Sequence, residues 1–251
     1  MLDLTGKSAV ITGCSSGIGT ETARLLSRQG AAVTLVARRE SVLNELAEEL
    51  RAAGGRVLVM AGDITEPGFP DAVCEKTAEE FGSVDILVNN AGIGDQNKAT
   101  VRTSDELWAK CVAVDETAQF RFCRAALRQM TRQGTGSIIN VSSIGGVYSI
   151  AGAAYSSAKA AILGLTKNIG VQYAGSGIRC NAVCPGPTET PMLAPDQDMD
   201  LEMLEIVGRR ADMNAGMSQP SDIANAILFF ASDEARNING QALVIDKGSC
   251  I

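Results

Sequence analysis

The residues best suited to move a proton are Tyr155 and Lys159. The chain contains no histidine, which excludes Ser-His-Asp and Cys-His mechanisms and dehydrogenases that use histidine as acid or base. Tyr155 and Lys159 have i and i+4 spacing, so on a helix their side chains share one face. A free phenol has a pKa near ~10, and a neighbouring ammonium lowers that pKa. A surface Tyr–Lys pair has the same spacing, so other motifs must support this interpretation.

Two hydroxyls could assist that proton transfer. Ser142 and Ser143 directly follow a predicted strand, and a hydroxyl at the carboxyl end of a strand could polarise a substrate carbonyl. The alternative is a turn or a helix N-cap, which are common roles of serine.

A glycine-rich stretch near the N-terminus has the chemistry of a phosphate-binding loop. The sequence TGCSSGIG runs from Thr12 to Gly19 between a predicted strand and a predicted helix. Glycines such as Gly13 and Gly17 would let backbone N–H groups approach a pyrophosphate, whose charge a helix N-terminus favours. The spacing differs from the commoner G-x-G-x-x-G pattern, and a plain strand-to-helix turn is the alternative.

Three further segments are placed to contact a dinucleotide. Arg38 follows the second strand, where an arginine accommodates the 2′-phosphate of NADP(H) and an acidic residue would bind the ribose of NAD(H). We therefore expect NADP(H) to be preferred, with NAD(H) possible; a solvated charge pair with Arg39 is the alternative. Asp63 follows the third strand, either touching adenine or forming a turn. Residues 89–92, Asn-Asn-Ala-Gly, end the fourth strand and would let a cofactor lie against backbone.

Short apolar runs alternate with amphipathic stretches along the chain. In the latter, apolar residues recur every three or four positions, as in Leu43, Leu46 and Leu50, which predicts helices. This alternation predicts an α/β fold, a Rossmann-type doubly wound parallel sheet with helices on both faces. The predicted strands are Ser8–Ile11, Ala32–Ala37, Val57–Ala61, Ile86–Asn89, Ser137–Val141, Arg179–Val183 and Ala242–Ile245.

We expect a single domain over residues 1–251, because no linker, repeat or low-complexity tract interrupts the pattern. The stretch from about residue 186 to 220 is irregular and rich in proline. Long excursions of this kind are usually lids or binding loops, so we expect a substrate lid at about residues 190–217. Apolar residues such as Met192, Leu201 and Met217 would line its pocket. A helix packed permanently on the core is the alternative.

Together these motifs resemble the short-chain dehydrogenase/reductase family over essentially the whole chain. The matching elements, in family order, are TGxxxGIG, NNAG, NVSS, YxxxK and Asn181 leading to Pro185-Gly186. The resemblance implies a Rossmann sheet of about seven strands. It also implies hydride transfer between a nicotinamide cofactor and a carbonyl or secondary alcohol.

The same resemblance assigns roles to single residues. Tyr155 would be the acid and base, Lys159 would bind the nicotinamide ribose, and Ser143 would contact the substrate, with Ser142 as the fallback. Family members are usually homotetramers, so we expect a homotetramer or a homodimer. The implied cofactor-binding residues are Gly13, Ser15, Ser16, Gly17, Ile18, Gly19, Arg38, Asp63, Ile64, Asn90, Ala91, Gly92, Tyr155, Lys159, Pro185, Gly186, Thr188 and Thr190.

Two positions depart from the family pattern. Asp115 stands where the family has a catalytic asparagine; we keep it in the catalytic set and expect an altered proton relay. Aspartate lacks the amide N–H donors and can be charged. Near the C-terminus the family's D-G-G is Asp246-Lys247-Gly248, which could alter the tail near the cofactor or a subunit contact.

Composition narrows the partners. A net charge of −7 disfavours nucleic acid and anionic membranes. We see no signal-like segment and no apolar run near the ~18 residues of a membrane helix, so we expect a cytoplasmic protein. Seven unclustered cysteines argue against a disulfide framework, and without histidine we expect no metal site.

These patterns predict an NAD(P)-dependent oxidoreductase acting on a lipophilic substrate. A free ketone or hydroxysteroid-like alcohol is favoured over a 3-oxoacyl thioester, because the chain and its lid are acidic. The alternative is a non-catalytic dinucleotide-binding sensor or scaffold with the same fold. That alternative does not explain why Ser143, Tyr155 and Lys159 all stand at catalytic positions.

Overall fold

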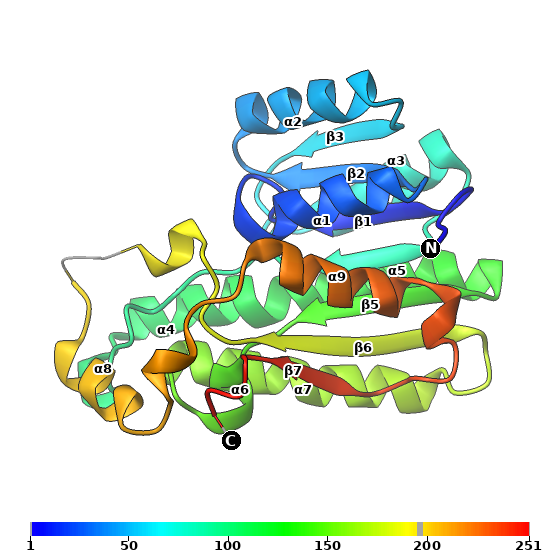
Figure 1. The fold of residues 1–251 in the computed structure, drawn as a ribbon. Helices are drawn as coiled ribbons and strands as arrows, with labels where there is room; N and C mark the ends of the chain where they lie inside the picture. Colours follow the sequence, from blue (N-terminus) through cyan, green and yellow to red (C-terminus); the bar gives the residue numbers. More distant parts are fainter. Residues whose placement is uncertain (1, 195–197, 251) are drawn as a thin grey trace.

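A seven-stranded parallel sheet forms the centre of the molecule (Figure 1). The computed structural model describes residues 2–194 and 198–250. The strand order is β3-β2-β1-β4-β5-β6-β7, and every neighbouring pair is parallel. This confirms the predicted doubly wound α/β fold. The strands are β1 Ser8–Thr12, β2 Ala32–Ala37, β3 Val57–Ala61, β4 Ile86–Asn89, β5 Gly136–Val141, β6 Ile178–Pro185 and β7 Ala242–Ile245.

Strand β6 differs most from its predicted bounds. The sequence predicted Arg179–Val183, whereas the strand begins one residue earlier and ends two residues later, at Pro185. Pro185 pairs with Ile245 of β7, and the N–H of Gly186 then donates to the Ile245 carbonyl at 2.9 Å. Proline is tolerated at this position because the strand ends there. The longer strand carries the chain directly to the carboxyl edge of the sheet.

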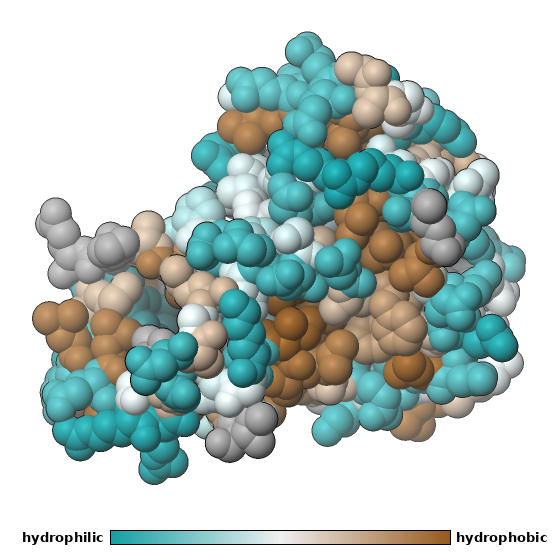
Figure 2. Space-filling view, in the orientation of Figure 1, coloured by the Kyte–Doolittle hydropathy of each residue, from teal (hydrophilic) through white to brown (hydrophobic). Residues whose placement is uncertain are grey.

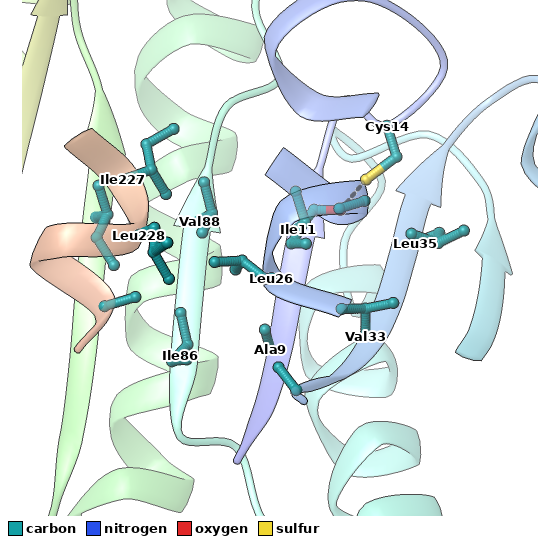
Figure 3. Packing of buried hydrophobic residues seen from close by; sticks show 14 of the residues in the cluster. Ala9, Ile11, Cys14, Leu26, Val33, Leu35, Ile86, Val88, Ile227 and Leu228 are labelled. Carbon is teal, nitrogen blue, oxygen red and sulfur yellow. Dashed lines mark hydrogen bonds between the residues drawn. The ribbon is translucent and has the colours of Figure 1, made fainter. Parts of the chain in front are cut away.

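Helices cover both faces of the sheet. Strand residues alternate between the two layers, so that Ala9 and Ile11 face one and Val10 faces the other. Figure 3 shows the first layer, where Leu26 of α1 and Ile227 of α9 pack over the strands. On that face lie α1 (Gly17–Arg28), α2 (Glu40–Ala52) and α9 (Pro220–Ala231); on the other lie α3 (Phe69–Phe81), α5 (Ala118–Gln133) and α7 (Ala153–Gln172).

The remaining elements are short. Residues 186–194 and 198–219, which include α8 and the described part of the predicted lid, project from the sheet, in yellow to orange in Figure 1; residues 195–197 of that lid lie outside the described part of the chain. The short helices are α4 (Asp105–Cys111), α6 (Ile144–Tyr148), α8 (Leu201–Gly208) and the π-helical segment η2 (Val112–Thr117). Single 3₁₀ turns are η1 (Thr100–Arg102), η3 (Pro191–Leu193), η4 (Met213–Ala215) and η5 (Asp233–Ala235).

The cysteines form no disulfide framework in the described part of the chain. All seven cysteines are free thiols, and all except Cys250 are buried. Most serve as small apolar side chains in the two core layers. Within residues 2–194 and 198–250, no helix has the length and apolar character needed to cross a membrane.

Candidate active site

The strand order reverses between β1 and β4. From β1 the chain proceeds through β2 and β3 on one side, and it returns to the other side of β1 at β4. In sheets of this type ligands bind at that reversal, outside the carboxyl ends of the strands. The glycine loop follows β1, residues 90–92 follow β4, Ser142 and Ser143 follow β5, and residues 186–190 follow β6. The predicted motifs therefore meet at one edge of the sheet.

Two glycines bring three of these segments into contact. A Cβ on Gly13, whose φ is +75°, would lie 2.7 Å from Asn90 Nδ2 and 2.9 Å from Ala91 Cα. A Cβ on Gly17, whose φ is +56°, would lie 2.8 Å from Thr190 Cγ2. Glycine is needed at both positions for its conformation and for the close approach. The glycine loop is thus fixed between the turns after β4 and β6.

The N-terminus of α1 can receive an anion. The helix begins at Gly17, and Ser16 precedes it in an extended conformation. In the described part of the chain the Ser16 side chain makes no capping hydrogen bond, so the N–H groups of the first turn lack that partner. A pyrophosphate would supply acceptors where the helix dipole favours negative charge. A cavity of about 420 Å³ also borders Ser15, Ser16 and Gly17, but it lies between α1 and α2 and is lined by Glu21, Glu45 and Glu49, so we do not assign the anion to it.

Arg38 and Asp63 mark the end of the crevice beside β2 and β3. Hydrogen bonds of 2.8 Å from the backbone and hydroxyl of Thr65 hold the pKa of the Asp63 carboxyl below its ordinary value, and Arg38 adds to this. Asp63 therefore forms the turn that one interpretation expected, with Ile64 buried beside it. Arg38 is exposed. The next residue, Arg39, donates to the Ser15 carbonyl at 2.8 Å, which fastens this segment to the glycine loop.

Helix α7 presents Tyr155 to the loop after β5. Ser143 Oγ and the Tyr155 ring lie on the same side of Gly145, where a Cβ would meet them at 3.4 and 3.5 Å, and Ser143 Oγ accepts the Gly145 N–H at 3.0 Å. Ser142 is used differently, because its buried hydroxyl donates to the Lys159 carbonyl at 2.8 Å. Ser143 thus lies beside the phenol, while Ser142 fastens α7 to β5.

Lys159 lies one turn after Tyr155 and is almost completely buried, with 2% of its surface exposed. Its Nζ donates to the Val141 carbonyl at 3.1 Å and lies 3.3 Å from Asp115 Oδ1. The same ammonium lies 5.5 Å from the centre of the Tyr155 ring. Burial alone would lower the pKa of Lys159, but the charges of Asp115 and Tyr155 raise it above its ordinary value. The ammonium is therefore held cationic beside the phenol.

Asp115 is fully buried in the π-helical segment η2. Its Oδ1 accepts the Ile93 N–H at 3.1 Å and faces Lys159. A Cβ on Gly92 would lie 2.6 Å from Asp115 Oδ1 and 3.2 Å from Lys159 Nζ, so Gly92 makes room for this ion pair. Burial raises the pKa of the Asp115 carboxyl, and Lys159 opposes the rise. The aspartate at the family's asparagine position thus contacts Lys159 directly through its side chain.

The pKa of Tyr155 differs from the sequence expectation. Lys159 and the Ser143 hydrogen bond lower it as expected, but burial, the largest influence, raises it, and the charges of Asp115 and Asp95 add to the rise. The net effect is a phenol whose pKa lies above its ordinary value. The YxxxK motif identifies the cation but contains no information on the low-dielectric surroundings or the two carboxylates.

The segment after β6 closes the site from the C-terminal side. Thr188 is buried, and its hydroxyl donates to the Gly186 carbonyl at 2.9 Å, whereas Thr190 contacts the glycine loop. A Cβ on Gly186 would lie 2.7 Å from the Cβ of Asp246. Lys247, the departure from the family's D-G-G, has a φ of +56° and donates from Nζ to the Met217 carbonyl at 2.6 Å. The C-terminal tail is therefore joined to the end of the predicted lid.

One buried carboxylate near the site was not identified from the sequence. Asp95 follows the NNAG turn, is 2% exposed, and accepts the backbone N–H of Tyr155 at 2.9 Å. The available signal was Gly152, which precedes the helix of Tyr155 and has no side chain to cap it. An acceptor from elsewhere in the chain was therefore to be expected.

Two other possible sites lie apart from this chemistry. A cavity of about 510 Å³ lies at the opposite, amino edge of the sheet and is lined by Lys7, Asp85 and Arg179 among others. It contains none of the site residues above, so we assign the chemistry to the carboxyl edge. Among the described residues, no group of three or more cysteine or acidic side chains is arranged to hold a metal ion.

Comparisons with known proteins agree with this geometry. The family model described as enoyl-(acyl carrier protein) reductase matches residues 13–249. The chain is 39% identical to cis-4-hydroxycyclohexanecarboxylate dehydrogenase of Sinomonas cyclohexanicum, over 96% of this chain and 95% of that protein. It is 35% identical to 3beta-hydroxysteroid dehydrogenase 2 of Eggerthella lenta, over 98% and 95% of the two chains.

A solved structure shares both the fold and much of the sequence. A single-residue variant of actinorhodin polyketide ketoreductase, crystallised with NADPH, superimposes with a TM-score of 0.85 at 34% identity. The match covers 96% of each chain. These relatives are dehydrogenases and reductases that act on CH–OH and carbonyl groups.

Proposed function

The chain belongs to the short-chain dehydrogenase/reductase family, and we propose from this premise that it interconverts a lipophilic ketone and its secondary alcohol with NADP(H). As a family member it is an oxidoreductase acting on CH–OH groups by hydride transfer. The proposal concerns the catalytic residues, the preferred cofactor, the class of substrate and the assembly.

The observation that carries the proposal is the cluster of the half-buried Tyr155 and Ser143 with the buried Lys159. Tyr155 gives a proton to the carbonyl oxygen in reduction and removes it from the alcohol in oxidation. Ser143, which lies beside the Tyr155 ring, polarises the same oxygen. Lys159 stabilises the phenolate by its charge, and Asp115, 3.3 Å from Lys159 Nζ, holds that ammonium in place.

The crevice residues fit a nicotinamide dinucleotide. The open first turn of α1 and the close glycine contacts suit a pyrophosphate. Asn90, Ala91 and Gly92 would border the middle of the cofactor, and Pro185, Gly186, Thr188 and Thr190 would border its nicotinamide end, where Lys159 would bind the ribose. When bound, the cofactor supplies or accepts the hydride.

The preference for NADP(H) rests on Arg38. Its guanidinium is exposed at the end of β2, where a 2′-phosphate would lie, and Asp63 beside it is occupied by the Thr65 turn. Replacing Arg38→Asp should move kcat/KM toward NADH, by roughly tenfold or more if one charge-assisted contact is lost. A kcat/KM that favours NADH in the unmodified protein would contradict the assignment.

Apolar side chains at the mouth of the site support a lipophilic substrate. Val147 and Tyr148 of α6 are 37% and 43% exposed, and Met192 and Leu193 of η3 are each 48% exposed. In this proposal, residues 190–217 form a lid over the bound substrate. The named relatives include enzymes of alicyclic and steroid alcohols, which supports a free cyclic ketone or alcohol. A 3-oxoacyl thioester is the second candidate, because the relatives also include 3-oxoacyl-[acyl-carrier-protein] reductases.

We also propose a homotetramer, with a homodimer as the smaller alternative, in the cytoplasm. Strand β7 is an edge of the sheet, and Leu243 on it is 42% exposed. Figure 2 shows apolar side chains gathered between α9 and β7. Exposed apolar patches beside a sheet edge usually mark surfaces that a partner covers. The free state of all the cysteines supports a reducing compartment.

The test is a panel of cyclic ketones, steroid ketones and acetoacetyl thioesters, with the matching alcohols, run with NADPH and NADH. We expect turnover with a cyclic or steroid substrate and NADP(H). Turnover confined to thioesters would replace the substrate class. No turnover with any substrate, together with tight NADPH binding, would favour a sensor or scaffold.

A further inference from the structure

The helix that carries the proposed acid and base is capped by a residue from another part of the chain. Helix α7 begins at Ala153, and Gly152 at its N-cap has no side chain to accept the first N–H groups. Oδ2 of Asp95 accepts the Tyr155 N–H at 2.9 Å instead. A Cβ on Gly152 would collide with both carboxylate oxygens of Asp95. The glycine and the distant aspartate thus replace a local N-cap.

The loop that carries Asp95 is tightly specified. Asp95 Oδ1 also accepts the Asn97 N–H at 3.2 Å, and the Lys98 carbonyl accepts the Ala153 N–H at 3.0 Å. Gln96 and Asn97 both have left-handed backbone conformations, with φ of 57° and 52°. Such conformations are unfavourable for residues other than glycine and persist only where the surroundings fix them. The loop therefore holds Asp95 against α7 at some conformational cost.

The same loop, residues 95–102, holds the N-terminus of α8, the helix within the proposed lid. The Gln96 carbonyl accepts the Asp200 N–H at 2.9 Å, and Asp200 Oδ2 accepts the Ala99 N–H at 3.0 Å. The guanidinium of Arg102 binds both oxygens of Asp200, at 2.6 and 2.9 Å. Asp200 in turn caps α8 through the Met203 N–H. The catalytic helix and the lid helix are therefore attached to the same eight residues of the chain.

The charge of Asp95 reaches the phenol. Tyr155 is surrounded by Lys159 on its own helix, Asp115 on η2 and Asp95 on the loop after β4. The thiol of Cys111 on α4 lies within the field of both carboxylates. Burial raises the pKa of the Asp95 carboxyl, while hydrogen bonds from backbone N–H groups, Tyr155 first among them, oppose the rise and favour the ionised form. With only 2% of its surface exposed, its charge is weakly screened by solvent.

We propose that Asp95 is a positioning residue of the reaction, which fixes the first turn of α7 and sets the charge against which the Tyr155 phenol ionises. This inference rests on the proposed role of Tyr155 as acid and base. Asp95 contacts the backbone of Tyr155 and no reacting atom, so it acts through the position and the ionisation of the phenol.

The test compares Asp95→Asn with Asp95→Ala in alcohol oxidation, measuring kcat and KM against pH with the best panel substrate. Oxidation speeds up as the phenol deprotonates, so removal of a nearby negative charge should move the rising limb to lower pH, by about half a unit or more. Asparagine can still accept the Tyr155 N–H, so kcat at its plateau should stay within about threefold. Alanine loses the cap as well, and kcat should fall roughly tenfold or more.

Asp105→Asn is the matched control, because it removes the same charge from an exposed position on α4. Its profile should coincide with that of the unmodified protein. An Asp95→Asn profile that also coincides would overturn the electrostatic part of the proposal. Equal kcat in the alanine and asparagine variants would overturn the positioning part.

A second measurement separates this inference from the proposed function. Phenolate formation is followed by ultraviolet absorbance, and the Tyr155→Phe variant identifies the contribution of Tyr155 among the three tyrosines. Asp95→Asn should shift that contribution to lower pH even in a protein that turns over no panel substrate. An unshifted titration would overturn the electrostatic part of the inference, whereas absent turnover would overturn only the proposed function.

Discussion

The glycine loop and the segment from Asp200 to Met217 both lie at the carboxyl edge of the sheet, but they are attached to the molecule differently. The loop is clasped by backbone contacts from the turns after β4 and β6, with a Cβ on Gly13 or Gly17 finding less than 3 Å of room. The second segment is held near its ends by Arg102 and Lys247 and in between by the Asp212 N–H, which donates to the Ser249 carbonyl at 2.7 Å; it exposes Leu201 and Ile206. Under the proposed function, cofactor recognition is therefore built into the core, whereas substrate recognition depends on a less tightly packed segment.

The largest effect should come from separating cofactor binding from chemistry. Tyr155→Phe removes the proton donor and keeps the ring, so kcat should fall by ~10²–10⁴ while the Kd for NADPH stays within about threefold. Tyr173→Phe makes the same change where α7 ends and should leave both unchanged. Near-normal kcat in Tyr155→Phe would remove this residue from the mechanism. The measurements are steady-state kinetics and NADPH fluorescence titration.

The tight packing of the glycine loop can be tested by adding one methyl group to Gly13. Gly13→Ala places a Cβ 2.7 Å from Asn90 Nδ2 at a φ of +75°, so NADPH binding should weaken by roughly tenfold or more. Gly6→Ala is the matched control, because Gly6 has a φ of +81° and no atom within 4 Å of the added Cβ. That control should lose only about 1 kcal/mol of unfolding free energy. Equal Kd values in the two variants would show that the Gly13 contact does not shape the cofactor site.

The loosely held side is tested at its anchor. Arg102→Met removes the two hydrogen bonds to Asp200, and KM for the substrate should rise about threefold to tenfold with little change in the Kd for NADPH. Hydrogen exchange in α8 should speed up in the variant and slow when cofactor and substrate are both added. Equal exchange with and without ligands would indicate a helix packed permanently on the core.

The smallest effect concerns the aspartate at the family's asparagine position. The charge of Asp115 raises the pKa of the Tyr155 phenol and of Lys159. Asp115→Asn should therefore move the rising limb of oxidation to lower pH, by about one unit or less, with kcat within a few-fold of its original value. A superimposable profile would mark Asp115 as a neutral substitution. Activity present only in the asparagine variant would instead indicate a non-catalytic parent.

What the sequence predicted depends on how far apart the interacting residues are. The helix periodicity of Leu43, Leu46 and Leu50 is local, and the structure buries all three in one core layer. The glycine loop and the Tyr155–Lys159 pair are also short-range patterns, and the fold brings them to one edge.

Contacts between residues far apart in the chain could not be predicted from the sequence. Asp95 meets α7 only after the sheet has formed, and the π-helical segment around Asp115 gives no local signal. The raised pKa of Tyr155 has the same origin, because burial and carboxylates from other segments outweigh its helix neighbour. The extra length of β6 likewise depends on pairing with β7, which lies far along the chain.

The bond between Lys247 and the Met217 carbonyl bears on how large a molecule the site admits. A segment attached at only one end can move away from the site and admit a substrate of any length. A segment attached at both ends, by Arg102 near its start and Lys247 at its finish, and also at Asp212 by the Ser249 carbonyl, can move outward only between these attachment points. The height of the opening beneath the segment is then limited by the length of chain between the attachment points. We therefore expect flat, compact ring systems to enter beneath this segment more easily than a long acyl chain attached to a carrier.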